Sequence, residues 1–291
     1  VLSFGTAGCN LTCKFCQNHD ISKSREFDKL QSKASPELIV KAAKETGCRS
    51  VAFTYNDPVI FFEYAIDVAK ACRESGIKTV AVTAGYITNE AAIEFFSHMD
   101  AANIDLKAFT RDFYHRLCSG KLAQVLEILK YLKHETEVWF ELTNLIIPGE
   151  NDDELEIEEM TRWILKNLGS DVPLHFTAFH PDWKMMDRPK TPPETLIKSR
   201  AIAKKNGIKH VYTGNIHDFD TASTYCHSCG KLVIGRDWHM LSDWNLNFGN
   251  NYSGNCGNCG EPVAGVFEPK PGVWGRKRVP IRFSQNKTKS S

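Results

Sequence analysis

The sequence lacks the features that would direct it to a membrane, to secretion or to nucleic acid. No apolar run approaches the roughly 18 residues that a bilayer-spanning helix needs, and we expect no secretory signal peptide. The 36 Lys and Arg nearly balance the 35 Asp and Glu, so the formal charge of +1 predicts no strong overall attraction to nucleic acid or lipid. Repeats are lacking too. The sequence opens on the strand-like run Val1–Phe4 without an initiator methionine, which leaves open whether residues precede it.

The composition is that of an ordinary globular protein apart from its cysteines. With 291 residues, 42% of them hydrophobic and 24% charged, the chain can form a core domain and a small appendage. Ten cysteines is a high count. Disulfide scaffolds belong to shorter secreted chains, so we expect a reducing cytoplasm. Cys48, Cys72 and Cys118 stand alone, and we expect them to be small buried or partly buried apolar residues.

Hydrophobic patterns predict strands that alternate with helices. The expected strands cover residues 50–54, 79–83, 102–106, 137–147 and 173–178, with a short run at 211–213. The expected helices cover 35–46, 59–75, a segment capped by Thr88, 122–132, 152–168 and 192–206. Such alternation implies parallel βα units. Six or seven units fall short of the eight in a closed barrel, so we predict an α/β fold with a partial (β/α) barrel over residues 1–215.

Three cysteines near the N-terminus form the strongest motif. Cys9, Cys13 and Cys16 have the spacing C-x3-C-x2-C and follow the first apolar run. Thiolates this close together in one loop can bind a single inorganic centre, as cysteines do around iron–sulfur clusters. Three ligands leave one iron of a four-iron cluster without a protein donor, and that open position could chelate a cofactor. A zinc loop or three unrelated thiols are the alternatives.

The triad, the aromatic Phe15 before its last cysteine and its place after a first strand resemble the radical S-adenosylmethionine (SAM) enzymes. The resemblance implies a [4Fe-4S] cluster on Cys9, Cys13 and Cys16, whose free iron chelates the amino and carboxylate groups of SAM. It also implies that an electron, supplied by a donor such as flavodoxin or ferredoxin, cleaves SAM to a 5′-deoxyadenosyl radical that abstracts hydrogen from a substrate.

Several predicted strands end in polar residues where a buried core would prefer apolar ones. The period of two places each of three pairs on one face of a strand: Asp105 with Lys107, Glu141 with Thr143, and His175 with Thr177. Each pair alone is compatible with an interior ion pair or hydrogen bond. Together they predict a polar chamber over the cluster, because burying so many polar groups is costly unless a ligand satisfies them.

Further segments resemble the glycyl-radical-enzyme activating enzymes, such as pyruvate formate-lyase activating enzyme, and more closely the radical SAM member of the AmmeMemoRadiSam group. The matching segments are residues 53–58, 103–109, 113–118 and 179–181. By position, the resemblance implies that Phe15 packs near the adenine of SAM. It also implies that the cofactor is bound by Tyr55, Asn56, Asp57 and Thr83. The implied catalytic residues are Asp105 and Lys107. Memo-like and AMMECR1-like proteins are the implied partners.

One departure from the family pattern concerns the segment that holds the SAM amino group. Tyr55 and Asn56 replace both glycines of the family's Gly-Gly-Glu, and Asp57 replaces its longer acid. Glycines permit a close backbone approach that Tyr and Asn do not. We therefore still expect SAM to bind, but the case for a glycyl-radical protein as the substrate is weaker. The substrate, a protein or a small molecule, stays open.

A second cysteine cluster lies near the C-terminus. Two C-x2-C-Gly knuckles supply four cysteines, Cys226, Cys229, Cys256 and Cys259. Four thiolates suit a closed, tetrahedral structural zinc site, with an iron centre or no metal as alternatives. We predict a zinc-ribbon-like module over residues 216–267, in which Trp238 and Trp244 pack the small core. His227 is a weaker ligand candidate, expected to be a solvated loop residue.

Two other classes of function remain possible from the sequence. One is an electron-transfer protein with a four-iron cluster and no SAM chemistry, against which the polar strand ends and Phe15 argue. The other is a zinc-ribbon module that binds nucleic acid on a degenerate barrel. The tail 268–291 carries seven Lys and Arg from residue 270 onward and could touch RNA, but we expect a solvated tail and no RNA partner.

Overall fold

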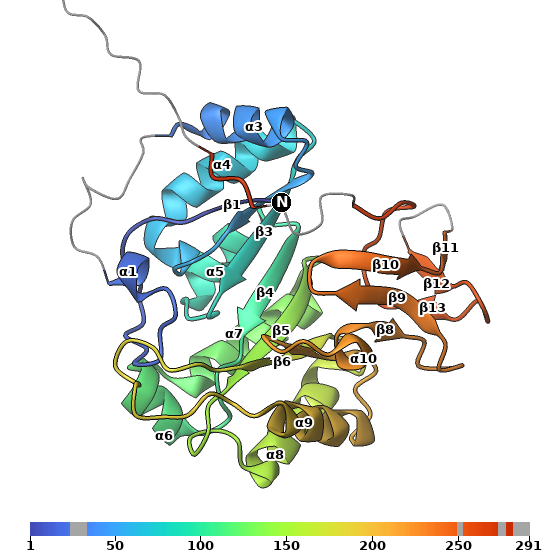
Figure 1. Ribbon diagram of the computed structural model, residues 1–291. Coiled ribbons are helices and arrows are strands. Elements are labelled where there is room, and N and C mark those ends of the chain that lie inside the picture. Colours follow the sequence, from blue (N-terminus) through green and yellow to red (C-terminus); the bar gives the residue numbers. More distant parts are fainter. Residues whose placement is uncertain (24–33, 249–252, 273–277, 282–291) are drawn as a thin grey trace, which may run out of the picture.

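The computed structural model describes residues 1–23, 34–248, 253–272 and 278–281. Seven parallel strands form one sheet in the order of the sequence (Figure 1). Their bounds are β1 (Leu2–Phe4), β2 (Ser50–Phe53), β3 (Lys78–Thr83), β4 (Ala101–Asp105), β5 (Trp139–Ile146), β6 (Leu174–Ala178) and β7 (Val211–Gly214). Among the described residues β7 does not pair with β1, so the barrel is open. The predicted partial barrel is confirmed, its seventh strand included.

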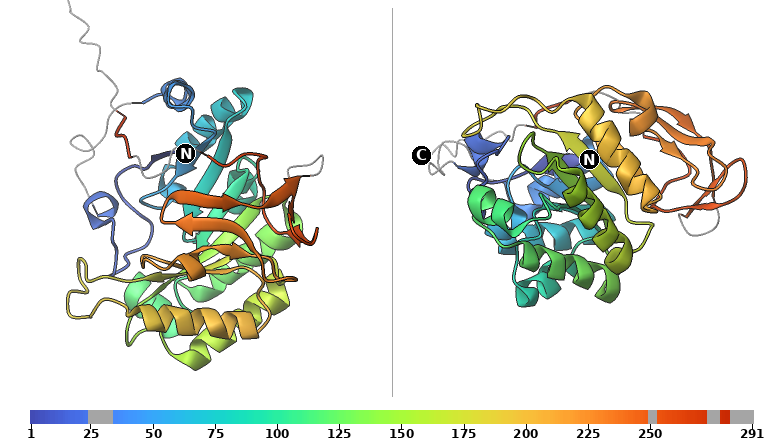
Figure 2. Two further views of the ribbon diagram at one scale, coloured as in Figure 1. Left: turned by 45° about the vertical axis from the view of Figure 1, so that its right-hand side comes forward. Right: turned by 90° about the horizontal axis from the view of Figure 1, so that it is seen from below.

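Helices connect the strands and cover the outer face of the curved sheet (Figures 1 and 2). They are α1 (His19–Ser22), α3 (Pro36–Glu45), α4 (Phe62–Glu74), α5 (Asn89–Phe96), α6 (Arg111–Phe113), α7 (Leu122–Glu135), α8 (Glu154–Leu168), α9 (Pro193–Lys205) and α10 (Phe219–Ala222). A 3-10 turn, η1 (Pro58–Phe61), precedes α4, and a π-helical segment, η2 (Tyr114–Cys118), follows α6. The capping residue predicted for α5 is confirmed, because the Thr88 side chain accepts a hydrogen bond from the Ala91 amide.

The strands alternate between a buried face, which is mostly apolar, and a half-buried face that carries most of the polar side chains. In β5, Phe140, Leu142 and Ile146 are buried in the main core, whereas the intervening Glu141 and Thr143 are only half-buried. This alternation follows from the two-residue period of a strand. The apolar face of the sheet packs against the helices. Each large side chain buried there stabilises the fold by roughly 1.5–3 kcal/mol. The inner face of the barrel is thereby left free for polar groups.

The C-terminal module consists of two small antiparallel sheets. One contains β8 (Thr224–Tyr225), β9 (Leu232–Asp237) and β10 (Met240–Trp244), and the other β11 (Leu246–Phe248), β12 (Gly254–Cys256) and β13 (Pro262–Val263). The module has a separate core of six buried residues: Cys226, Val233, Ile234, Leu246, Cys256 and Val263. Trp244 packs against this core, as predicted.

The prediction for Trp238 is wrong. Trp238 is 50% exposed, and its ring stacks on His217 with the centroids 5.8 Å apart. The reason is that β9 continues to Asp237, which pairs with Met240 of β10, so Trp238 occupies the hairpin turn. Within the described part of the chain, no helix is long and apolar enough to cross a membrane. Most of the predicted basic tail lies outside the described residues.

Candidate cluster and cofactor site

A cavity of about 240 Å³ lies where the C-terminal ends of the barrel strands meet the cysteine loop. It brings together all ten residues that the sequence predicted for the cluster, the cofactor and catalysis: Cys9, Cys13, Cys16, Phe15, Tyr55, Asn56, Asp57, Thr83, Asp105 and Lys107. These residues come from the cysteine loop and from the ends of β2, β3 and β4, because parallel strands direct their carboxyl ends to the same edge.

The cysteine loop is fixed from one side by Asn56. The Asn56 side chain accepts a hydrogen bond from the Thr6 amide at 3.1 Å and donates one to the Gly8 carbonyl at 2.8 Å. Gly5 allows this close approach, since a Cβ there would lie 2.3 Å from the Thr54 carbonyl oxygen and 2.5 Å from Asn56 Oδ1. Asn56 therefore positions the loop while it lines the cavity.

The π-helical segment η2 supports the loop from the other side. The amides of Thr12 and Lys14 donate to the carbonyls of Cys118 and Leu117 at 3.0 and 2.9 Å. A hydrogen bond from the Cys118 side chain lowers the pKa of Cys13 to about 7, although burial opposes this shift. The thiolate is the form that binds metal, so Cys118 favours the ligand form of Cys13. The sequence identified Cys118 only as a small buried residue, which is confirmed; its contact with the triad was missed.

Asp57 joins the ends of two neighbouring strands. Its carboxylate accepts hydrogen bonds from the Thr83 hydroxyl and the Ala84 amide, both at 2.9 Å. Burial raises the pKa of this carboxyl group, and those hydrogen bonds work against the shift. Tyr55, one position after a strand-end threonine, has a φ of 72°, which side chains other than glycine rarely adopt. It takes this conformation where the activating-enzyme pattern has glycine.

An ion pair lies on the opposite wall. Lys107 Nζ is 2.8 Å from Asp105 Oδ2 and 5.9 Å from the centre of the Phe15 ring. Phe15 is itself buried and packs on Phe113. Burial alone would lower the pKa of Lys107, but the Asp105 carboxylate and the Cys13 thiol outweigh it and raise that pKa well above its usual value. A permanent positive charge therefore faces the cavity beside the cluster loop.

The predicted polar chamber over the cluster is only partly correct. Thr143 and Thr177 line this cavity, whereas Glu141 and His175 lie in a different one at the other end of the barrel. Residues two positions apart on a strand share a face but lie about 6.6 Å apart along the strand. This separation places Glu141 and His175 too far from the cysteine loop to line its cavity. The sequence missed Lys23 and Asn215, which also line the cavity. The Gly-Asn pair that ends β7 was the available signal for Asn215.

The four C-terminal cysteines also come together. Their sulfur atoms all lie within 4.8 Å of one another, which suits a single metal ion. A hydrogen bond from the Lys231 amide contributes most to lowering the pKa of Cys229, to about 6. His227 does not belong to this group. As expected, it is an exposed loop residue, although its side chain is only 20% exposed and lies 3.2 Å from a Glu261 carboxylate oxygen.

An open parallel barrel with a cavity at its C-terminal edge, lined by three cysteines of one loop, is an α/β architecture suited to a bound cofactor. The chain belongs to the radical SAM superfamily, whose model matches residues 4–161. It is therefore an enzyme of the radical SAM type, and this family implies an iron–sulfur cluster, SAM as the cofactor and SAM-dependent radical chemistry. The donor set fits that assignment, since three cysteines from one loop line the cavity; the pKa of Cys13 is lowered, whereas burial raises that of Cys9.

Two curated relatives and one solved structure illustrate the similarity. The chain is 36% identical over 263 residues to the uncharacterized protein MJ0808 of Methanocaldococcus jannaschii, covering 90% of this chain and 77% of that protein. It is 25% identical over 179 residues to the pyruvate formate-lyase-activating enzyme of Clostridium pasteurianum, covering 60% and 72%. The structure of Streptococcus suis SuiB bound to S-adenosylmethionine matches its fold with a TM-score of 0.59 at 15% identity, covering 74% of this chain and 51% of that one.

Proposed function

We propose that the protein binds a [4Fe-4S] cluster through Cys9, Cys13 and Cys16 and binds SAM in the adjoining cavity. The observation that carries this proposal is the convergence of all ten predicted residues on one cavity at the C-terminal edge of the barrel. When bound, the cluster and SAM supply the one-electron cleavage that yields a 5′-deoxyadenosyl radical for hydrogen abstraction. A protein such as flavodoxin or ferredoxin is the proposed electron donor.

The residues of the chain position and enclose these groups. Asn56 and η2 hold the cysteine loop in place, and Asp57 fixes the β3 end that carries Thr83. The Lys107 ammonium and the Asp105 carboxylate offer opposite charges that a zwitterion such as SAM can complement. Phe15 and the threonines supply a wall that limits access of water. The relation to activating enzymes supports hydrogen abstraction from a protein or small molecule, and Memo-like or AMMECR1-like partners remain predictions.

The ligand assignment is tested by Cys13→Ala. After anaerobic reconstitution with iron and sulfide, we expect this variant to lose the brown absorbance of the cluster and to form no 5′-deoxyadenosine from SAM, because a four-iron cluster then has two protein ligands instead of three. Cys48→Ala, which changes a half-buried thiol outside the cavity, should behave as wild type. Visible absorbance, iron content and chromatography of the nucleoside product are the measurements.

An intact four-iron spectrum in Cys13→Ala would contradict the ligand assignment. A second contradicting result concerns the reconstituted wild-type protein. If SAM does not change its electron paramagnetic resonance signal and no 5′-deoxyadenosine is released, an electron-transfer role becomes the better explanation.

A further inference from the structure

A second and much larger cavity lies at the opposite end of the barrel. Its volume is about 1560 Å³, and its walls come from the N-terminal ends of the strands and from the C-terminal module. Figure 1 shows the module at these strand ends, away from the cysteine loop. We call this cavity the module chamber. Ligand pockets for small molecules usually measure about 300–1,000 Å³, so the module chamber has room for a complete organic molecule.

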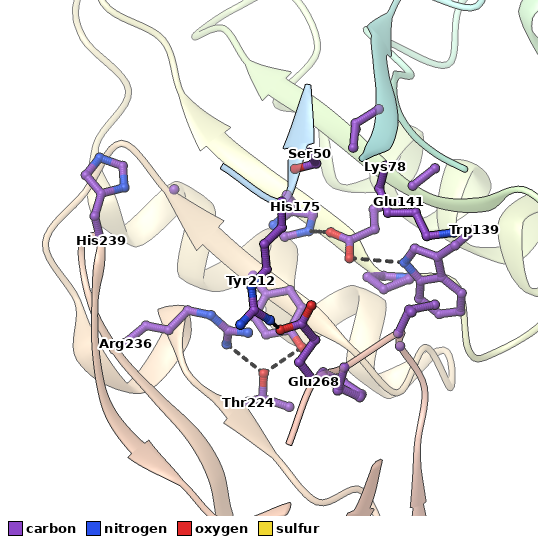
Figure 3. Close-up of a pocket in the computed structure, with 18 of the residues that line it drawn as sticks. Ser50, Lys78, Trp139, Glu141, His175, Tyr212, Thr224, Arg236, His239 and Glu268 are labelled. Atoms are coloured by element: carbon purple, nitrogen blue, oxygen red, sulfur yellow. Dashed lines mark hydrogen bonds and ion pairs between the residues drawn. The ribbon is translucent and has the colours of Figure 1, made fainter. Parts of the chain in front are cut away.

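A continuous stack of polar side chains crosses the module chamber (Figure 3). Glu141 Oε2 of β5 lies 2.7 Å from His175 Nε2 of β6. The His175 ring stacks on Tyr212 of β7 with the centroids 5.0 Å apart. Arg236 comes from β9 of the module, and its guanidinium lies over the Tyr212 ring, 5.4 Å from the ring centre. The module therefore completes a site that the barrel strands begin.

The Arg236 side chain has hydrogen-bond donors that no hydrogen bond among the described residues uses. Its Nη1 donates to the Thr224 hydroxyl at 2.6 Å and to the Ala222 carbonyl at 3.4 Å, and both acceptors are neutral. Among the described residues no carboxylate forms an ion pair with it, whereas two other cations of the chamber are paired, Lys78 with Asp100 and Arg49 with Glu268. A guanidinium with free donors at a chamber wall is suited to a carboxylate or phosphate group, which it can bind with two hydrogen bonds.

The other residues that line the module chamber indicate what kind of body the anionic ligand has. Trp139, Val80 and Phe267 contribute apolar surface to the module chamber. Asn215 lines both this chamber and the cluster cavity, so this residue lies between the two spaces at the end of β7. We propose that the module chamber binds the substrate, an organic anion whose carboxylate or phosphate pairs with Arg236 and whose apolar or aromatic body extends along the barrel toward the cluster. The assignment of this ligand as the substrate rests on the proposed function; the anion site itself does not.

The test measures binding of two simple probes, phenylacetate and phenyl phosphate, to the full chain by isothermal titration calorimetry without SAM. We expect saturable binding of at least one probe. Arg236→Gln should weaken that binding by about tenfold or more, because a charged hydrogen-bonded partner of the anion is lost. Arg162→Gln, which removes an arginine on the exposed face of α8, is the matched control and should bind as wild type.

A second variant distinguishes a ligand contact from a structural role of Arg236. Glu141→Gln removes a negative charge from the same stack, so it should tighten anion binding by about threefold or more. A damaged fold cannot produce tighter binding. Binding of phenylacetate alone or of phenyl phosphate alone would support the proposal and identify the anion as a carboxylate or a phosphate.

Absence of saturable binding to wild type, or equal affinity in Arg236→Gln, would overturn the site. The SAM cleavage assay fails or succeeds independently of this titration, so a failure of the proposed function is distinguishable from a failure of the module chamber.

Discussion

At the scale of single residues, the pair formed by Lys107 and Asp105 shows how the cavity tolerates charge. The lysine side chain is 14% exposed and the aspartate 35%, and their charged atoms lie 2.8 Å apart. The Lys107 amide also donates to the Tyr114 hydroxyl at 3.1 Å, which fixes the backbone after β4. A charge enclosed to this degree is costly without its partner. The pair thus maintains an ionised cavity wall before any cofactor binds.

Replacement of Lys107 by Met should lower the free energy of unfolding by about 2 kcal/mol, less than the 3–5 kcal/mol for a fully buried pair, because Asp105 keeps some contact with water. The double variant Lys107→Met with Asp105→Asn should cost clearly less than the sum of the single variants. Urea unfolding of the four cluster-free proteins measures this coupling. Strictly additive losses would mean that the two charges do not stabilise each other.

At the scale of elements, the cysteine loop is held by three segments outside it. The end of β2 supplies Asn56, the π-helical segment η2 supplies two backbone acceptors, and Lys23 beyond α1 donates to the Leu11 carbonyl at 2.7 Å. The loop has little regular structure of its own. Its shape is therefore determined by these anchors, and a change at an anchor should affect the cluster without any change of a cysteine.

Gly5→Ala tests this dependence. The new Cβ would collide with the Thr54 carbonyl and with Asn56, so we expect the loop to shift, the iron content to fall and the protein to lose roughly 1–3 kcal/mol of stability. Gly272→Ala is the matched control, because a Cβ there meets no atom of the described residues within 4 Å. Iron analysis after reconstitution and thermal unfolding are the measurements; full iron content in Gly5→Ala would contradict the proposed anchoring.

At the scale of the whole molecule, we expect the C-terminal module to depend on its cysteines for stability, and the module supplies part of the wall of the module chamber. Six buried residues form the module core, and two of them are cysteines. So small a core rarely folds unaided, and bound metal commonly supplies the missing free energy. Arg236 belongs to β9 of this module and contacts Tyr212 of the barrel. Metal in the cysteine site should therefore determine whether Arg236 reaches the chamber.

We propose that this metal is zinc and predict that Cys256→Ser will contain less zinc than wild type. The variant should also bind the anionic probes of the module chamber much more weakly, because an unfolded module no longer holds Arg236 beside Tyr212. Cys72→Ala, which changes a buried cysteine of α4 outside the module chamber, should retain both properties. Inductively coupled plasma mass spectrometry and calorimetry are the measurements. Extra iron in place of zinc in the wild type would contradict the metal assignment, and unchanged probe binding by a zinc-free variant would contradict the coupling.

The local elements could be predicted from the sequence alone. Hydrophobic patterns indicate six or seven strands that alternate with helices, because each strand must bury one face against those helices. The spacing of Cys9, Cys13 and Cys16, and of the two C-terminal knuckles, is also a local property, since ligands a few residues apart meet in any tight loop. The strand-end residues predicted near the triad line the same cavity as the cysteines, and their roles toward a cofactor stay predictions.

Two features became visible only in the folded structure: how far along the barrel each strand residue lies, and which segments distant in the sequence contact each other. Periodicity placed Glu141 with Thr143 and His175 with Thr177 on common faces, yet each pair divides between the two cavities, because position along a strand depends on the register of the sheet. The contact of Cys118 with Cys13 and of Arg236 with Tyr212 joins segments far apart in the chain. Such contacts arise from packing of the whole molecule, which no local pattern records.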